Sequence, residues 1–92
     1  MTYALRYHPR VIDEDKKRVS VAQWARIGRA IETRLAISPE RYGEPLAGSL
    51  QGYRKLRVGD YRVVFEVVAN DVRIIAIIHR REVYGRAARR VG

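Results

Sequence analysis

The clearest pattern along this chain is an alternation of polar and apolar side chains between residues 53 and 68. The stretch reads YRKLRVGDYRVVFEVV and is interrupted at Gly59-Asp60. Alternation with a period of two predicts β-strands, and a two-residue loop with glycine first predicts a type II′ hairpin turn. We therefore expect two antiparallel strands, at residues 53–58 and 61–68, joined by that turn.

Counting outward from this turn predicts which side chains share a face of the hairpin. Arg57 should lie opposite Arg62, and Lys55 opposite Val64. Directly opposed residues point to the same side of a sheet, and successive residues point to opposite sides. Lys55, Arg57 and Arg62 are therefore expected on one face. The other face is expected to be apolar and to carry Leu56, Val63, Phe65 and Val67.

A third strand is predicted at residues 72–79, VRIIAIIH, after a tight turn at Asn70-Asp71. If those two residues form the whole loop, Arg62 lies opposite His79. His79 then joins the basic face, beside Ile75 and Ile77. A bulge in either strand would shift this register by one residue.

The N-terminal part of the chain predicts one strand and a short helix. Residues 2–7, TYALRY, alternate as a strand does. Pro9 suits the first turn of a helix at about residues 10–17. This helix has acidic residues early and basic residues late, an order that complements the helix dipole. Asp13, Glu14 and Asp15 are accordingly interpreted as acids at a helix start.

A second, longer helix begins at a capping box formed by Ser20 and Gln23 and runs to about residue 36 or 37. Its apolar side chains recur at intervals of three and four, which predicts a stripe that faces the core. The stripe consists of Trp24, Ile27, Ile31 and Leu35. Ser38-Pro39 ends the helix, and the glycines and prolines of residues 38–52 predict a turn-rich connection without regular structure.

Basic side chains follow the third strand. Arg80, Arg81 and Tyr84 come just past its end, and residues 82–91 predict a short basic helix interrupted by Gly85. The tail from Arg86 to Arg90 is expected to become ordered only against a partner. The whole chain thus predicts one α+β domain, residues 1–92, in the order β-α-α-β-β-β. It should have a small antiparallel sheet with two N-terminal helices packed on one face.

Composition and charge narrow the classes of function. The net charge is +9, with a pI near 10.6, which implies attraction to nucleic acid or to an acidic protein. There is no cysteine, so disulfides, thiolate chemistry and finger-type zinc sites are excluded. No group of His, Asp and Glu has metal-ligand spacing, and no cofactor is expected. No secretory or membrane-spanning segment is visible, so the expected location is the cytoplasm.

The expected pairing of Arg57 with Arg62 points to a ligand. Like charges directly opposed across two strands destabilise a sheet. A site that holds a polyanion tolerates this cost, because the planar arginine fork matches phosphate oxygens. The alternative is a solvated sheet face that happens to be basic.

The runs YRKLRVGDYRVVFEV and VRIIAIIHRREVY, preceded by ERYGEPLAGSLQGY, resemble the RelE/ParE toxin superfamily of type II toxin–antitoxin modules, most closely its RelE branch. The segments LRVGDYRV and HRREVY are the specific parts, and the resemblance covers nearly the whole chain. It implies a RelE-like fold and an endoribonuclease that cuts mRNA in the ribosomal A site. It also implies a cognate antitoxin that neutralises the toxin, and a hetero-oligomer that binds operator DNA through that antitoxin.

The resemblance also implies site residues, matched motif by motif. It places Lys55, Arg62, Arg80 and Tyr84 among the catalytic groups. Two positions depart from the pattern. Tyr53 stands where well-studied relatives have a second lysine. One basic group is therefore either missing or supplied by Arg54 or Arg57. Ile78 stands where several relatives have glycine.

RNA can be cleaved without a metal by attack of its own 2′-OH on the adjacent phosphate. The protein must position the strand, stabilise the charge that develops on the phosphate, and handle the transfer of two protons. Arg57, Arg62 and Arg80 suit the phosphate, because arginine stays protonated and is no routine proton shuttle. Lys55, His79 and Tyr84 remain as acid–base candidates, and Tyr84 alternatively stacks a base. Additional RNA contacts are expected from Arg54, Arg57, Arg81 and Arg86.

Two other functions fit the sequence. One is a ParE-like poison that binds DNA gyrase and has no nuclease site, although such chains generally lack the Lys/His/Tyr set. The other is a catalytically weak module that binds nucleic acid or antitoxin, which the loss of the lysine at Tyr53 favours.

Overall fold

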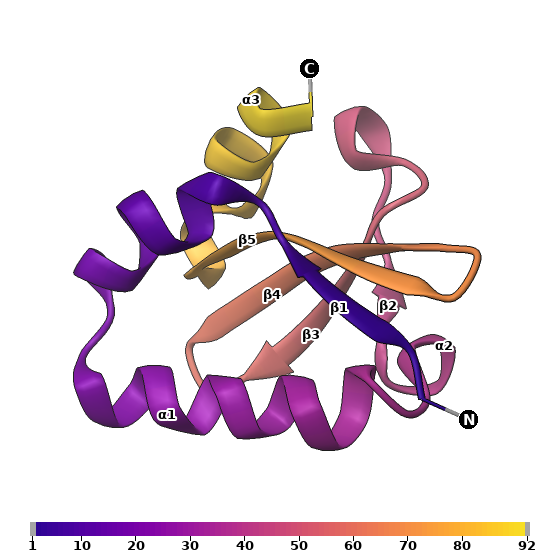
Figure 1. Cartoon of the computed structure of the whole chain (residues 1–92). Helices are drawn as coiled ribbons and strands as arrows, with labels where there is room; N and C mark the ends of the chain where they lie inside the picture. The colour runs from indigo at the N-terminus through magenta and orange to yellow at the C-terminus, as the bar shows by residue number, and fades with distance from the viewer. Residues whose placement is uncertain (1, 92) are drawn as a thin grey trace.

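The computed structural model describes residues 2–91, which form a five-stranded sheet in the order β1-β5-β4-β3-β2 (Figure 1). The strands β3, β4 and β5 form an antiparallel meander, and β2 joins its outer edge antiparallel to β3. At the other edge β1 runs parallel to β5, so the sheet is mixed rather than purely antiparallel as expected. The strands are β1 (Ala4–Tyr7), β2 (Glu44–Pro45), β3 (Arg54–Val58), β4 (Tyr61–Val68) and β5 (Asp71–His79).

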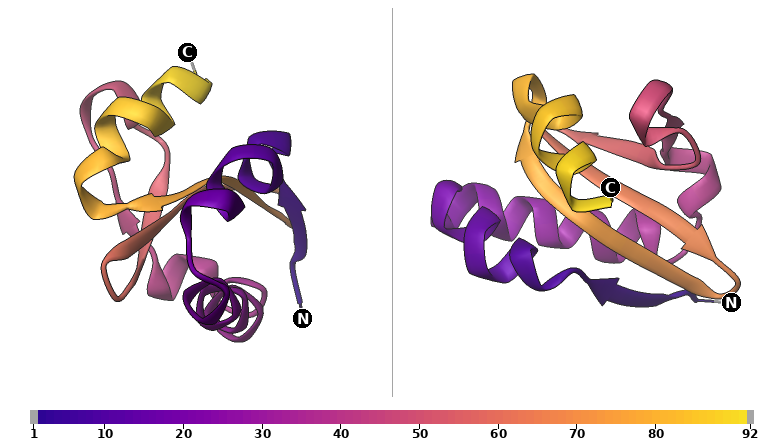
Figure 2. Two further views of the ribbon diagram at one scale, coloured as in Figure 1. Left: turned by 90° about the vertical axis from the view of Figure 1, so that its left-hand side faces the viewer. Right: turned by 90° about the horizontal axis from the view of Figure 1, so that it is seen from above.

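The N-terminal helices cover one face of this sheet, as predicted (Figure 2). Ser20 Oγ accepts a hydrogen bond from the Gln23 backbone N–H at 3.2 Å, which confirms the expected helix start. The apolar stripe packs into a core with the inner side chains of β3, β4 and β5. The helical segments are η1 (Val11–Asp15), η2 (Lys16–Arg18), α1 (Val21–Ala30) and η3 (Ile31–Leu35).

A second helical layer packs on the opposite face and was only partly expected (Figure 2). It consists of η5 (Arg80–Glu82), η6 (Val83–Ala87) and α3 (Ala88–Val91), so the helix continues through Gly85. Val83 and Ala87 are buried against Val64 and Ala76 of the sheet. The C-terminal segment is therefore ordered on the chain's own sheet, which contradicts the expectation that it requires a partner.

The segment expected to lack regular structure holds three short elements, α2 (Pro39–Tyr42), β2 and η4 (Gly48–Leu50). Each is too short to show a hydrophobic period, which is why sequence pattern missed it. Gly43 is required here, because a Cβ at this position would clash with the ring of Phe65. Arg54 ties the segment to β3, since its Nη2 donates to the carbonyl oxygens of Gly43 at 2.9 Å and Glu40 at 3.2 Å.

The turn between β4 and β5 differs from the prediction by one residue. The loop is Ala69-Asn70, so that Val68 pairs with Asp71, and a bulge between Val64 and Phe65 shifts the register again. Ala69 adopts a φ of 54°, a left-handed conformation that alanine disfavours. Sequence reasoning placed the turn at Asn-Asp, because those residue types favour such conformations.

Asp15 is the buried charge that joins the first helix to the last. The parallel ladder between β1 and β5 ends at the pair Tyr7–Ile74, and beyond it side chains replace the missing strand. Asp15 Oδ2 accepts from the backbone N–H of Ile77 at 2.8 Å, and Arg90 Nη1 donates to the carbonyl oxygen of Ile75 at 3.1 Å. Asp15 is therefore no ordinary helix-start acid, because its side chain is fully buried.

Two arginines from the C-terminal layer neutralise this carboxylate. Arg90 donates to both oxygens of Asp15 at 2.6 and 2.7 Å, and Arg86 Nη2 donates to Oδ1 at 2.9 Å. The Arg90 side chain is only 2% exposed. The hydrogen bond to Asp15 raises the pKa of Arg90 and outweighs the effect of burial. This cluster fixes the C-terminal layer on the sheet.

Among the helices within residues 2–91, none is long and apolar enough to cross a membrane.

Asp15→Asn should lower the free energy of unfolding by about 3–5 kcal/mol, because Arg86 and Arg90 lose their buried counter-charge and keep only the partly exposed carboxylates of Glu14 and Glu82. Urea unfolding followed by circular dichroism measures this change. Asp13→Asn is the matched control, because Asp13 is exposed two positions away, and it should shift stability by less than about 0.5 kcal/mol. Equal stability of the two variants would contradict the structural role of Asp15.

Candidate nucleic-acid interface

The β3–β4 hairpin places three basic side chains on one face of the sheet, as predicted. Gly59 has a φ of 59°, and Arg57 pairs directly with Arg62 across the turn. Lys55 pairs with Val64, one step further along the same face, and is half-buried. This face lies opposite α1, because Leu56 and Val63 occupy the core beneath that helix.

Arg62 lies at the centre of this basic group. Its Nη1 donates to the carbonyl oxygens of Gly59 at 3.0 Å and of Tyr61 at 2.9 Å, which holds the side chain against the turn. Burial, followed by the charges of Arg57 and Arg80, lowers the pKa of the Arg62 guanidinium from its usual value. The group still carries its charge at neutral pH, so this site favours the arrival of an anion.

Arg80 joins the group from beyond the end of β5. Its backbone N–H donates to the carbonyl oxygen of Asp60 at 2.9 Å, which ties η5 to the β3–β4 turn. Its side chain is exposed and close enough to Arg62 to influence its titration. We call the surface formed by Lys55, Arg57, Arg62 and Arg80 the cationic face.

Tyr84 belongs to η6, which packs on the same face of the sheet as Lys55 and Arg62. The backbone N–H of Ala47 lies 3.5 Å from its hydroxyl oxygen, a long contact that leaves the hydroxyl proton free. The Leu46 N–H donates to the carbonyl oxygen of Tyr53 at 2.9 Å, so this loop is held along β3. The Tyr84 ring is about half exposed, at 53%, and is therefore available to a ligand.

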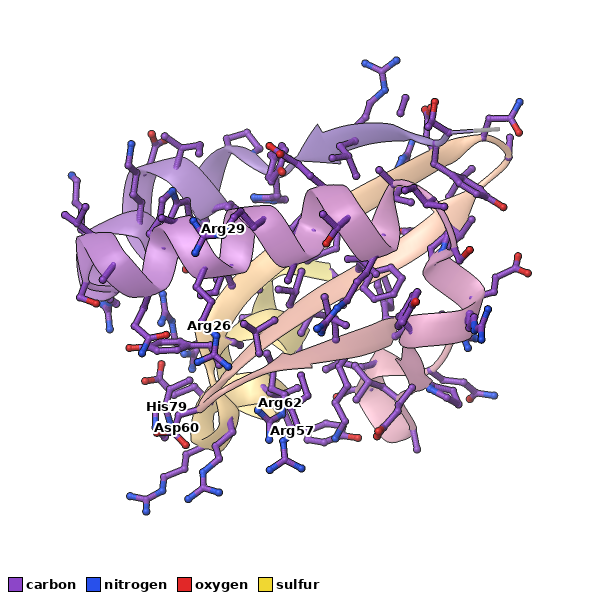
Figure 3. The ribbon with its side chains drawn as sticks, turned by 90° about the horizontal axis from the view of Figure 1, so that it is seen from below. Arg26, Arg29, Arg57, Asp60, Arg62 and His79 are labelled. Carbon is purple, nitrogen blue, oxygen red and sulfur yellow. The ribbon has the colours of Figure 1, made fainter. Side chains whose placement is uncertain are left out.

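His79 lies on the other face of the sheet, and the prediction that it joins Arg62 is wrong. It pairs with Tyr61, while Arg62 pairs with Ile78. The shifted turn moves the pairing by two residues and preserves the face, whereas the bulge moves it by one and places His79 on the opposite side. Its ring meets that of Tyr61 edge to face, with 5.9 Å between centroids. Its Nδ1 accepts from the Arg81 backbone N–H at 3.3 Å. Figure 3 shows His79 and Asp60 at the turn end of the sheet, with Arg57 and Arg62 nearby.

Two of the arginines expected to contact RNA are engaged elsewhere. Arg54 is half-buried and bonded to the backbone of α2, on the face opposite Lys55. Arg86 is 14% exposed in its side chain and is paired with Asp15 and with Glu82. Both therefore stabilise the fold, whereas Arg57 and Arg81 are exposed.

One acidic residue of this region was missed by sequence reasoning. Glu44 pairs directly with Lys55 across β2 and β3, so the two side chains share a face. Burial and the charge of Arg57 lower the pKa of Arg62, whereas the negative charges of Asp60 and Glu44 raise it. The signal was hidden because β2 has only two residues.

The cationic face combines three exposed or half-buried guanidinium groups with proton-carrying side chains. Such a set can hold a phosphate and stabilise charge that develops on it. Lys55, Glu44 and Tyr84 lie on this side of the sheet and can accept or donate a proton. Within residues 2–91 no three His, Asp or Glu side chains cluster as a metal site.

Comparison with known proteins assigns the fold. The chain resembles a chain of the toxin–antitoxin complex RelBE2 from Mycobacterium tuberculosis, with 24% identity, a TM-score of 0.79, and coverage of 87% of this chain and 100% of that chain. It resembles a mutant of the E. coli toxin RelE in the free state, with 21% identity, a TM-score of 0.75 and full coverage of both chains.

A third similar structure is the RelB–RelE antitoxin–toxin complex from Methanococcus jannaschii. The identity is 22% and the TM-score 0.67, and the match covers 86% of this chain and 94% of that chain. No curated protein sequence matches the chain. These likenesses show that the chain has the RelE-like fold.

The family models assign the family. The model described as the ParE toxin of the type II toxin–antitoxin system parDE matches residues 5–84, which is most of the chain. The matched segment begins in β1 and ends at Tyr84, so it includes every strand and the whole cationic face. The chain therefore belongs to the ParE toxin family of type II toxin–antitoxin systems, within the RelE/ParE superfamily that its motifs resemble.

Proposed function

We propose that this toxin is a metal-independent endoribonuclease that cleaves mRNA on the ribosome and so inhibits translation. The observation that supports this proposal is the grouping of Arg57, Arg62 and Arg80 around one turn, on the side of the sheet that also carries Lys55 and Tyr84. The mutual repulsion of these arginines gives no stability to the fold, whereas a phosphate placed among them relieves it.

The proposed reaction is attack of a ribose 2′-OH on the adjacent phosphate, with departure of the 5′-oxygen. Arg62 and Arg57 stabilise charge on the phosphate, and Arg80 acts nearer the leaving oxygen. Two protons must move, one from the 2′-OH and one to the leaving oxygen. Lys55 and Tyr84 are the groups that we propose for them. His79 is not included, because it lies on the other face of the sheet.

We further propose that a cognate antitoxin binds and neutralises this toxin. The similar structures from M. tuberculosis and M. jannaschii are toxin–antitoxin complexes. A net charge of +9 suits an acidic antitoxin segment. A toxin–antitoxin hetero-oligomer that binds operator DNA through the antitoxin follows as part of the same proposal.

A second candidate function is poisoning of DNA gyrase without nuclease activity. The match to the ParE toxin family favours it. The presence of Lys55 and Tyr84 on the same side of the sheet as the arginines favours the nuclease instead, because a gyrase poison has no need of proton-transfer groups there.

Arg62→Ala should lower the rate of mRNA cleavage by about 10²–10³-fold, because it removes the central guanidinium from the cationic face. Growth of induced cultures and primer extension of a translated mRNA measure the effect, and circular dichroism checks the fold. The control is Arg10→Ala, an exposed arginine of the N-terminal segment, which should leave cleavage unchanged. Gyrase-dependent DNA breaks with intact mRNA in wild-type cells would contradict the proposal.

Tyr84→Phe should lower cleavage by about 10²-fold, because it keeps the exposed ring and removes the hydroxyl that we propose moves a proton. Tyr84→Ala should lower the rate of cleavage by at least the same factor. Single-turnover cleavage on programmed ribosomes separates this loss from weaker binding. A Tyr84→Phe variant that cleaves at the wild-type rate would restrict Tyr84 to stacking against a base.

A further inference from the structure

A second basic surface lies at the open edge of β3, between α1 and the β3–β4 turn. β2 pairs only with Arg54 and Lys55, so Arg57 and Val58 lie at the edge of the sheet. A hollow of about 220 Å³ opens beside them. Its polar lining is Arg26, Arg29, Thr33, Arg34, Arg57 and the backbone of Gly59. We call this hollow the edge groove.

The edge groove carries positive charge without a counter-charge in its walls. No acidic side chain lines it. Among residues 2–91 the ion-paired arginines are found elsewhere, at Arg6, Arg10, Arg86 and Arg90. Four arginines, Arg26, Arg29, Arg34 and Arg57, line the hollow, and like charges gathered in one place repel one another. A bound anion would offset that repulsion.

The arginines are held in place from two sides. Nη1 of Arg26 lies 3.1 Å from the position that a Cβ at residue 59 would occupy, so Arg26 packs against the turn at Gly59. The Arg34 guanidinium carbon lies 5.9 Å from the centre of the Tyr42 ring, a cation–π contact. Figure 3 shows Arg26 on α1, between that helix and the turn that bears Arg57 and Arg62.

The size of the edge groove and its position indicate the kind of ligand. At about 220 Å³ it is smaller than the roughly 300–1,000 Å³ of pockets that enclose small molecules. Arginine forks bind phosphate oxygens in pairs. Arg57 belongs both to this groove and to the cationic face, so positive charge continues around the edge of β3 from one to the other.

We propose that the edge groove binds the sugar–phosphate backbone of the same RNA strand that crosses the cationic face, beyond the nucleotides that react there. This inference rests on the proposed function and adds the path of the substrate to it. Arg26 and Arg29 contact phosphates of the flanking nucleotides, and Arg57 is the point at which the strand passes around the edge of the sheet.

The test compares a short and a long probe made of 2′-O-methyl RNA, which cannot undergo attack by its own 2′-oxygen. A fluorescein-labelled trinucleotide is short enough to occupy the cationic face alone, whereas a dodecamer reaches both surfaces. Affinity for each probe is measured by fluorescence anisotropy over a range of salt concentrations. The variants are Arg26→Gln/Arg29→Gln and the charge-matched control Lys16→Gln/Lys17→Gln, whose lysines are exposed and outside the groove.

Arg26→Gln/Arg29→Gln should weaken binding of the dodecamer by about tenfold or more at 0.1 M salt. It should also reduce the slope of log affinity against log salt by about 1.4, because about 0.7 is lost per phosphate contact on a single strand. Binding of the trinucleotide should stay unchanged. The lysine control variant should change the affinity for neither probe by more than about twofold. Equal losses in the arginine and lysine variants, or no loss in either, would overturn the proposal.

Two further arms identify the cause of a failure. If Arg62→Ala leaves both probes bound at wild-type affinity, the proposed function fails, whatever the groove does. If Arg26→Gln/Arg29→Gln weakens binding of a glutamate-rich peptide but not of the dodecamer, the groove serves an acidic protein and the RNA path is wrong.

Discussion

The structure depends on the burial of one carboxylate, that of Asp15, against the edge of β5. The parallel partner strand β1 ends at Tyr7, so the backbone of β5 beyond Ile74 has no strand beside it. There the Asp15 carboxylate accepts from the Ile77 N–H, and the Arg90 guanidinium donates to the Ile75 carbonyl. A buried carboxylate is strongly unfavourable without counter-charge. Arg86 and Arg90 supply that charge and thereby dock the C-terminal helices on the sheet. The Tyr84 ring and η5 are positioned as a consequence.

The same residue type serves two opposite purposes in this chain. Arg86 and Arg90 are buried with acids and stabilise the fold. The arginines of the cationic face and the edge groove are crowded among like charges, which costs stability locally. Within the chain, Asp60 and Glu44 offset this repulsion only in part at Arg62, where the pKa is still lowered. This contrast between neutralised arginine and arginine crowded among like charges is the physical basis of the proposed function.

The hairpin and its basic face were predictable from sequence, because one glycine turn fixed the register from Arg57–Arg62 outward. The helix start at Ser20 was equally predictable. The face of His79 was not predictable, because it depends on the bulge between Val64 and Phe65, which no residue type in either strand indicates. The role of Asp15 was also hidden, since its partners lie more than 70 residues away along the chain. Local patterns carry no information about such pairs.

The proposed function requires that Arg57, Arg62 and Arg80 hold one phosphate group, and the guanidinium resonances of the protein report on this directly. A two-dimensional NMR titration of the ¹⁵N-labelled toxin with a 2′-O-methyl trinucleotide follows each arginine Nε–H separately. We predict that the resonances of these three arginines shift together along one binding curve, while those of Arg54 and Arg86, which are bonded within the fold, stay in place. Shifts confined to other arginines, or spread evenly over all of them, would contradict it.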